Sequence, residues 1–164
     1  IITKIKTKHP ELTQLIVGRD GRAHSPMMHH YICQAIIDTG LDVIDVGICP
    51  SPVVYFAVCQ LAMPTGLVIT ASHNPKEYNG IKICGIYGTQ IQEIQDIFEQ
   101  KSFIPLASTK GNIINRPIID EYINYLARQF PYLVGSKIRC IIDCANATGG
   151  TVLPKLVEKM QWSN

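Results

Sequence analysis

Residues 66–82 read Gly-Leu-Val-Ile-Thr-Ala-Ser-His-Asn-Pro-Lys-Glu-Tyr-Asn-Gly-Ile-Lys, and this stretch decides how the rest of the chain is interpreted. Its first half, Leu67 to Ile69, is a short apolar run of the kind that forms a strand buried on both faces. From Thr70 onward the residues carry hydroxyls, amides, an imidazole and charges, and Asn79-Gly80 is a strong turn signal. The sequence therefore predicts a buried strand that ends in a polar loop, which is where α/β proteins place their sites.

The residue types of this loop allow two interpretations. One is a surface turn, because most polar loops are built of turn formers. The other is a reactive site, because Ser72 follows a buried strand that would hold its hydroxyl rigidly, and Lys82 comes after a turn able to bring the chain back. A serine nucleophile needs a nearby proton acceptor or cation, and oxyanions need donors such as lysine. The sequence shows no acidic partner for His73, so a Ser-His-Asp hydrolase is not supported and phosphoryl chemistry on Ser72 remains.

The segment Thr70-Ala71-Ser72-His73-Asn74-Pro75, followed by Tyr78-Asn79-Gly80-Ile81-Lys82, resembles the active-site serine loop of the α-D-phosphohexomutases, the family of phosphomannomutase and phosphoglucomutase. The hexapeptide together with the later lysine is more specific than most short motifs. In that family the serine that matches Ser72 carries a phosphate. The resemblance therefore implies an intramolecular phosphotransferase that interconverts hexose 6-phosphate and hexose 1-phosphate through a phosphoserine and a bisphosphorylated sugar.

The resemblance also implies roles for the neighbouring residues. Mg²⁺ would bind the phosphate on Ser72, which is the only metal ligand that this chain would supply. Lys82 matches the lysine of the motif and would assist proton transfer or steady the transferring phosphoryl group; the alternative is a solvated lysine at a strand end. His73 and Asn74 would shape the loop and hydrogen-bond the phosphate, with local capping as the alternative.

An earlier polar turn, Gly18-Arg19-Asp20-Gly21-Arg22, follows the apolar run from Leu12 to Val17. Composition alone indicates a turn with a local ion pair. A Gly-x-Asp-x-Arg turn at this place also resembles the segment that packs beside the phosphoserine loop in the mutase family. The resemblance thus implies that Asp20, Arg22 and Arg19 support the serine loop.

Apolar runs at Leu12–Val17, Leu41–Val46 and Leu67–Ile69 predict three strands. Ser25-Pro26 and Ser51-Pro52 each precede a helical pattern, with the serine as predicted N-cap and the proline in the first turn. Strands that alternate with helices are typical of a parallel sheet with right-handed crossovers. Both polar loops would then lie at the same edge of the sheet, beyond the carboxyl ends of the strands.

The predicted first domain continues with a hairpin or bent strand over residues 81–87, antiparallel to its neighbour, and a helix from about Ile91. Residues 102–115 have little periodicity and are interpreted as a linker. The expected fold of residues 1–115 is therefore α/β, a three-layer α/β/α domain with a mixed, mostly parallel sheet.

Residues 116–164 predict the beginning of a second, similar domain. A helix starts near Pro117, a buried strand spans Ile138 to Ile142, and a further helix covers about 152–160. The resemblance implies an enzyme of four domains, with an Asp-Gly-Asp-Gly-Asp metal loop in the second, sugar specificity in the third and phosphate binding in the fourth. None of those motifs occurs in this sequence. We therefore expect a fragment that is inactive in isolation and that can self-associate through its incomplete second domain.

The substrate cannot be chosen from these residues, because the family sorts sugars in its third domain. The expected partners are a hexose phosphate and a hexose bisphosphate, with phosphomannomutase/phosphoglucomutase activity favoured over phosphoglucosamine mutase activity. A non-catalytic binding or assembly module, with Ser72 unphosphorylated, is the alternative from a different class of function.

Composition excludes other classes of partner. The 164 residues are 46% hydrophobic and 17% charged, with a formal net charge of +2 that is spread without long runs, so neither nucleic acid nor a membrane is an expected partner. The six cysteines have no CxxC spacing and are interpreted as buried and reduced in a cytoplasmic protein, with a disulfide framework or zinc site as the alternative. His24, His29 and His30 are interpreted as surface or packing residues rather than zinc ligands.

Overall fold

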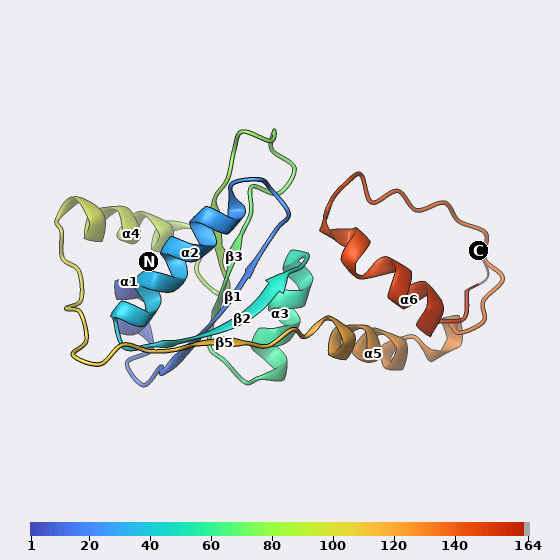
Figure 1. Cartoon of the computed structure of the whole chain (residues 1–164), viewed down its shortest axis with the longest axis horizontal. Coiled ribbons are helices and arrows are strands. Elements are labelled where there is room, and N and C mark those ends of the chain that lie inside the picture. The colour runs from blue at the N-terminus through green and yellow to red at the C-terminus, as the bar shows by residue number, and fades with distance from the viewer. Residues whose placement is uncertain (163–164) are drawn as a thin grey trace.

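A five-stranded sheet in the order β4-β3-β1-β2-β5 forms the centre of the first 115 residues (Figure 1). The structure is a computed structural model of the chain and describes residues 1–162. β1, β2 and β3 run parallel to one another and β4 runs antiparallel to β3, as predicted; β5 is a fourth parallel strand, which the sequence did not predict. The strands are β1 (Gln14–Arg19), β2 (Asp42–Ile48), β3 (Gly66–Ile69), β4 (Ile81–Ile83) and β5 (Ile113–Asn115).

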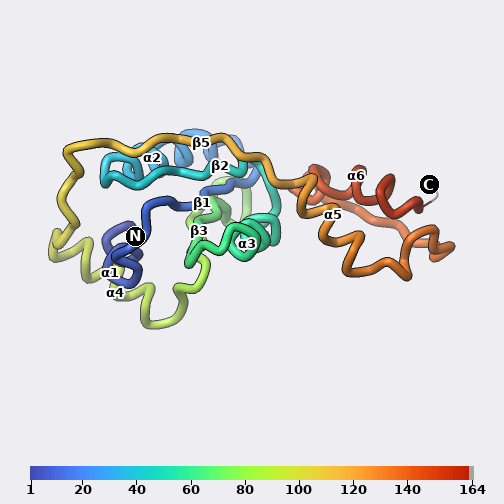
Figure 2. Tube along the Cα trace, turned by 90° about the horizontal axis from the view of Figure 1, so that it is seen from below, coloured from blue at the N-terminus to red at the C-terminus, as the bar shows by residue number. Residues whose placement is uncertain are grey.

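Helices cover both faces of this sheet, which gives the predicted three layers (Figure 2). One face packs against α2 (Ser25–Asp38), α1 (Ile2–Lys8) and α4 (Thr89–Glu99). The sequence predicted α2 and α4 but not α1. The other face packs against α3 (Ser51–Gln60). All four residues of β3 are buried, because each face of the strand lies beneath a helical layer. This burial fixes the point at which the polar loop begins.

The two Ser-Pro dipeptides begin helices as predicted, but their serines are not N-caps. Ser25 and Ser51 are the first residues of α2 and α3, and the N-cap positions are His24 and Pro50, without side-chain cap hydrogen bonds. The hydroxyl of Ser25 instead donates to the carboxylate of Asp20 and accepts from Nδ2 of Asn79, so its hydrogen-bonding capacity is used outside the helix.

Part of the predicted linker over residues 102–115 is a strand. β5 pairs in parallel with β2, in the register Val43↔Ile113 to Asp45↔Asn115. A Cβ added at Gly111 would lie 2.0 Å from the carbonyl oxygen of Leu41, so the chain approaches β2 more closely than any other residue type permits. The linker prediction was wrong here because a three-residue, exposed edge strand carries no periodic signal.

Beyond β5 the chain forms α5 (Ile119–Gln129) and α6 (Leu153–Lys159), which lie side by side in both views, with 3₁₀ turns at Pro131–Leu133 and Thr148–Thr151 (Figures 1 and 2). The predicted buried strand from Ile138 to Ile142 is wrong. Ile138, Ile141 and Ile142 are 71%, 100% and 51% exposed, and their backbone is irregular. A strand needs a hydrogen-bonded neighbour, and no described residue provides one.

The cysteine prediction holds only in part. Cys33 and Cys49 are buried, whereas Cys59 and Cys140 are exposed and Cys84 and Cys144 are half-buried. All six are free thiols. Among the described residues, the helices are too short or too polar to cross a membrane.

Candidate functional site

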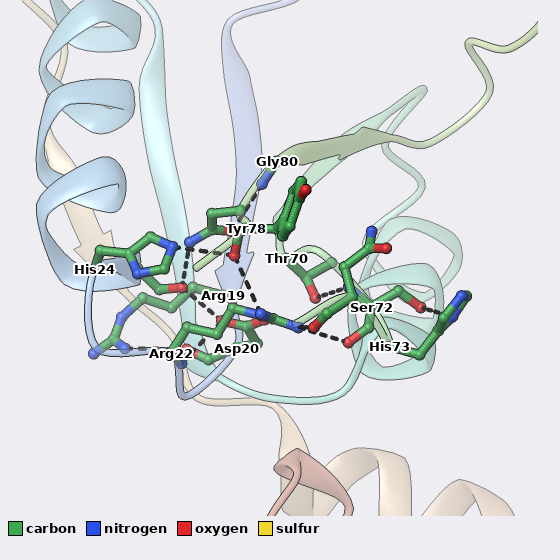
Figure 3. A network of polar contacts seen from close by, with 12 residues as sticks. Arg19, Asp20, Arg22, His24, Thr70, Ser72, His73, Tyr78 and Gly80 are labelled. Atoms are coloured by element: carbon green, nitrogen blue, oxygen red, sulfur yellow. Dashed lines mark hydrogen bonds and ion pairs between the residues drawn. The ribbon is translucent and has the colours of Figure 1, made fainter. Parts of the chain in front are cut away.

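Two loops meet at the carboxyl ends of β1 and β3, and together they form the candidate site (Figure 3). The first, residues 20–24, follows β1; the second, residues 70–80, is called the serine loop below. The N–H of Asp20 donates to the carbonyl oxygen of Ile69 at 2.9 Å, so the two loops start from one backbone contact. The N–H of Thr70 donates to the carbonyl oxygen of Gly80 at 2.9 Å, which closes the serine loop at its base.

Ser72 combines an exposed side chain with a constrained backbone. Its φ of +57° lies in the left-handed region, which residues other than glycine adopt rarely. The N–H of Ser72 donates to the hydroxyl oxygen of Thr70 at 2.9 Å, while its own Oγ lies 3.5 Å from Nδ1 of His73. Such a conformation persists only where surrounding contacts hold it, and it is common at functional sites. The hydroxyl is thus presented to solvent in a defined direction.

Arg22 binds the serine loop through four backbone carbonyl oxygens (Figure 3). Nη2 donates to the carbonyls of Ser72 and Asn74 at 2.9 and 2.8 Å, and Nη1 donates to those of Pro75 and Tyr78 at 2.7 and 3.1 Å. A planar guanidinium has enough fixed donors for this arrangement, and an ammonium does not. The side chain of Arg22 therefore fixes the backbone of the serine loop at four points between Ser72 and Tyr78.

Asp20 orients that guanidinium. Its Oδ2 accepts from Nε of Arg22 at 3.0 Å, and its Oδ1 accepts from the N–H of Arg22 at 3.1 Å and from Ser25 Oγ at 2.5 Å. Burial acts to raise the pKa of this carboxyl group, but the hydrogen bonds from Ser25, Arg22 and Thr70 together outweigh it, and the pKa is lowered. Asp20 is therefore ionised at neutral pH and fixes the side chain of Arg22 against the loop.

The remaining predicted residues lie at or near the serine loop with fewer contacts. Within the described part of the chain, the side chain of Arg19 donates only to the neighbouring carbonyl oxygen of Asp20, at 3.3 Å. Asn74 takes part through its backbone, since its N–H donates to the carbonyl of Ala71 at 3.1 Å and its carbonyl binds Arg22. His73 is exposed beside Ser72.

Lys82 lies on β4, opposite Val68 of β3. Residues paired across antiparallel strands point to the same face of a sheet, and Val68 belongs to the core on the α3 face. Lys82 is exposed on that side. Within residues 1–162 its amine makes no hydrogen bond or ion pair, so the structure does not bring it into direct contact with Ser72.

Three residues of the site were not predicted. Nε2 of His24 lies 3.1 Å from the carbonyl oxygen of Tyr78. The side chains of Ser25 and Asn79 hydrogen-bond each other at 2.9 Å, between α2 and the end of the serine loop. The sequence marked Ser25 as a helix cap and Asn79-Gly80 as a turn, and both patterns are local, so neither indicated a contact 54 residues away.

The three histidines near the start of α2 go to different partners, as expected for packing residues. His24 contacts the serine loop, His29 pairs with Asp45 of β2 at 3.2 Å, and His30 lies edge-on to Tyr31. The hydrogen bond that His29 donates to Asp45, with a further contribution from Cys33, raises the pKa of His29 to about 9. Across residues 1–162, no three His, Cys, Asp or Glu side chains come together in a way that would hold a metal ion.

The comparisons with known proteins point to one family. Residues 1–104 match the family described as phosphoglucomutase/phosphomannomutase, alpha/beta/alpha domain I. A phosphomannomutase/phosphoglucomutase of Pseudomonas syringae pv. tomato is 37% identical over 146 residues, which cover 88% of this chain and 31% of that protein. A probable phosphoglucosamine mutase of Methanobrevibacter smithii is 34% identical over 152 residues, 88% of this chain and 34% of that protein.

A solved structure shows the same arrangement of elements. The crystal structure of a phosphoglucomutase/phosphomannomutase family protein from Burkholderia thailandensis superposes with a TM-score of 0.76 at 26% identity, covering 97% of this chain and 36% of that one. The chain thus spans about a third of the length of the curated relatives that it matches.

Proposed function

The chain belongs to the phosphoglucomutase/phosphomannomutase family, and from this we propose that the protein carrying it interconverts hexose 6-phosphate and hexose 1-phosphate with Ser72 as the phosphoryl carrier. The observation that supports this most is the state of Ser72 itself. Its hydroxyl is exposed, its backbone is left-handed, and Arg22 holds the loop around it through four carbonyl oxygens. A group that must give and receive a phosphoryl group needs this combination of access and fixed direction.

The proposed reaction has two balanced transfers. In the first, the bond between phosphorus and Ser72 Oγ breaks and a bond to a hydroxyl oxygen of the hexose phosphate forms; the sugar hydroxyl loses its proton, and Oγ gains one. In the second, the bond between the other phosphorus and its sugar oxygen breaks and a bond to Ser72 Oγ forms; Oγ loses its proton, and the released sugar oxygen of the isomeric hexose phosphate gains one. Such transfers depend mainly on positioning and on groups that stabilise the charge of the transferring phosphoryl group.

Residues of this chain have proposed roles in those transfers. Lys82 would steady the phosphoryl oxygens or move the proton, with its amine extended from the edge strand β4. His73, whose Nδ1 lies 3.5 Å from Ser72 Oγ, would exchange the proton of that hydroxyl. Asp20, Arg22, Arg19 and Asn74 would keep the serine loop in the conformation that directs Oγ outward.

Mg²⁺ is a further part of the proposal. Oxygens of a phosphate on Ser72 are ligands that suit this ion, but no described cluster of acidic side chains accompanies them, so this chain supplies one ligand group and the rest would come from outside it. When bound, the ion would offset the charge on the phosphate.

The preferred sugar and the compartment are also proposals. Similarity to phosphomannomutase/phosphoglucomutase proteins favours mannose and glucose phosphates, whereas the relative described as a probable phosphoglucosamine mutase keeps glucosamine phosphate as an alternative. Six free thiols, two of them exposed, suit the reducing cytoplasm.

The test is the substitution Ser72→Ala in the protein expressed from its complete reading frame. We expect the variant to fold, to take up no phosphoryl group from a hexose 1,6-bisphosphate by intact mass, and to lose mutase activity. Ser108→Ala, which removes another exposed serine hydroxyl, serves as the control and should keep both phosphoryl uptake and mutase activity. Turnover of hexose phosphate at a normal rate by Ser72→Ala would refute the assignment.

The second candidate function, an assembly module, is favoured by one observation. The run from Ile138 to Ile142 exposes three isoleucines and has no neighbouring strand in the described part of the chain. Unpaired apolar segments of this kind join other chains. We expect the isolated 164-residue chain to lack mutase activity and to associate through residues 138–160, and Ile141→Lys to reduce the association in sedimentation experiments. A chain that stays monomeric at high concentration would contradict this second proposal.

A further inference from the structure

A buried hydroxyl joins the first turn of α2 to the far end of the serine loop. Ser25 is 0% exposed. Its Oγ donates to Asp20 Oδ1 at 2.5 Å and accepts from Nδ2 of Asn79 at 2.9 Å. Both the donor and an acceptor site of this hydroxyl are therefore used, and its rotation is fixed.

The orientation of Asn79 is fixed as well. Its Oδ1 accepts from the N–H of Gly80 at 2.9 Å, which leaves Nδ2 to donate to Ser25. Exchanging the oxygen and nitrogen of this amide would break both hydrogen bonds, so only one orientation satisfies the contacts. The end of the serine loop thus has a defined position relative to α2.

The network continues from Gly80 to Ser72. The carbonyl of Gly80 accepts from the N–H of Thr70, and the hydroxyl of Thr70 accepts from the N–H of Ser72, both at 2.9 Å. The N–H of Asp20 donates to the carbonyl oxygen of Ile69, the residue before Thr70, at 2.9 Å. The contacts form a closed ring that begins and ends at Asp20, and the amide of Ser72 is attached to this ring through the hydroxyl of Thr70.

We propose that Ser25 and Asn79 are positioning residues for Ser72, which fix its amide through Gly80 and Thr70 and so set the direction of its hydroxyl. Arg22 holds the carbonyl side of Ser72, and the ring through Ser25 and Asn79 holds the amide side. A serine at φ of +57° needs constraint on both sides, because its relaxed conformations lie elsewhere. The inference rests on the proposed role of Ser72 as phosphoryl carrier.

The chain contains a matched control. Ser51-Pro52 begins α3 in the same way that Ser25-Pro26 begins α2, with neither serine acting as a cap. Across the described residues, the hydroxyl of Ser51 makes no hydrogen bond. Ser51→Ala therefore removes a hydroxyl from the same helix position without touching the ring.

The experiment compares Ser25→Ala, Asn79→Ala, the double variant and Ser51→Ala in the protein expressed from its complete reading frame. The first readout is the rate at which Ser72 takes up a phosphoryl group from a hexose 1,6-bisphosphate. The reaction is quenched at successive times, and the mass of the intact protein is measured. The second is hydrogen exchange of the Ser72 and Thr70 amides, with the unfolding transition measured alongside. A purely structural role would change stability and leave the relative exchange within the loop unchanged.

We expect Ser25→Ala and Asn79→Ala each to slow phosphoryl uptake by about tenfold, the effect of losing one buried hydrogen-bond partner. The double variant should be no slower than either single one, because both changes open the same ring. The Ser72 amide should exchange faster in all three, and Ser51→Ala should match the unsubstituted protein. If Ser25→Ala does not fold, Asn79→Ala, which changes a partly exposed side chain, decides the question alone.

Wild-type uptake rates and unchanged protection of the Ser72 amide in Asn79→Ala would overturn the proposal, as would rate losses that multiply in the double variant. Absence of phosphoryl uptake by the unsubstituted protein would instead refute the role of Ser72. In that case hydrogen exchange still decides whether Ser25 and Asn79 hold the amide.

Discussion

Nη2 of Arg22 donates a 2.9 Å hydrogen bond to the carbonyl oxygen of Ser72, which lies 50 residues further along the chain. The same guanidinium reaches three more carbonyls of the serine loop while its Nε is held by Asp20. Backbone carbonyls in an irregular loop have no strand or helix partner, so the arginine takes the place of secondary structure here. The conformation of the loop therefore depends on a side chain from another loop.

Arg22→Lys should release the serine loop. A lysine keeps the charge but has a single donor group, which cannot reach four carbonyls at once. We expect the free energy of unfolding to fall by about 1–3 kcal/mol, and the amides of residues 72–78 to exchange faster by mass spectrometry. Arg128→Lys on the exposed face of α5 is the control and should change neither quantity. Unchanged exchange in Arg22→Lys would show that the loop holds its shape without the guanidinium.

Lys82→Met tests the proposed part of the edge-strand lysine in phosphoryl transfer. In the protein expressed from its complete reading frame, we expect the mutase rate to fall by about a hundredfold, which is typical for the loss of one acid or base group, while Ser72 still takes up a phosphoryl group. The measurement is steady-state turnover of glucose 1-phosphate together with intact mass. Lys137→Met, at another exposed lysine, should be active. An unchanged rate in Lys82→Met would reduce Lys82 to a solvated surface residue.

The pair of His29 and Asp45 predicts a loss of stability in alkali. Hydrogen bonding to Asp45 raises the pKa of His29 to about 9 from the ordinary value of 6.5. The folded chain therefore keeps a proton that the unfolded chain releases, and the stabilisation is complete below pH 6.5 and lost as the pH rises through about 9. We expect a decrease of about 3 kcal/mol in the free energy of unfolding across this range.

Urea unfolding from about pH 6 to about pH 9.5 measures this dependence. Asp45→Asn is the matched control, because its amide oxygen can still accept from the N–H of Gly47, as the Asp45 carboxylate does at 2.8 Å. The free energy of unfolding of Asp45→Asn should be lower than that of the unsubstituted protein at about pH 6, and it should change little as the pH rises to about 9.5. The thiol of Cys33, 3.5 Å from the His29 ring, and the guanidinium of Arg19 near Asp45 also face this pair. An equal slope in Asp45→Asn would assign the effect to these groups.

Gly111→Ala should weaken the attachment of β5 to the sheet. The added Cβ would lie 2.0 Å from the carbonyl oxygen of Leu41, which is backbone and cannot turn away. We expect thermal unfolding to show that the free energy of unfolding falls by about 2–4 kcal/mol, which is comparable to the cost of overpacking a core or breaking a strand pair. Gly150→Ala provides the comparison, since no atom lies within 4 Å of its added Cβ. Equal stability of the two variants would mean that β5 does not hold residues 102–115 in place.

The strands and helices with strong periodic patterns could be predicted from the sequence. The apolar runs are continuous in strands β1, β2 and β3, and the apolar residues recur at helical spacing in α2 and α3. Gly and Ser-Pro mark where these elements begin or end, so local residues decide their structure. The sequence also predicted that the loop containing Arg22 lies beside the serine loop, because parallel strands bring their carboxyl ends to the same edge of a sheet.

Features that depend on distant partners could not be predicted. β5 is three exposed residues that become a strand only because β2 offers a free edge. Residues 138–142 have the composition of a buried strand but lack a neighbour among the described residues, so the same rule fails in the opposite direction. Ser25 carries a good capping pattern, and only the folded chain shows that Asp20 and Asn79 take its hydroxyl.

Pairing of β5 with β2 determines where the two halves of this chain can bend. Immediately after β5, the N–H of Arg116 donates to the carbonyl oxygen of Asp45 at 2.8 Å, so the backbone leaves the sheet from a clamped position. A hinge that opened or closed access to Ser72 would therefore have to act beyond Arg116, because the segment from Gly111 to Asn115, despite its loop-like composition, is hydrogen-bonded to the first domain and would move with the sheet.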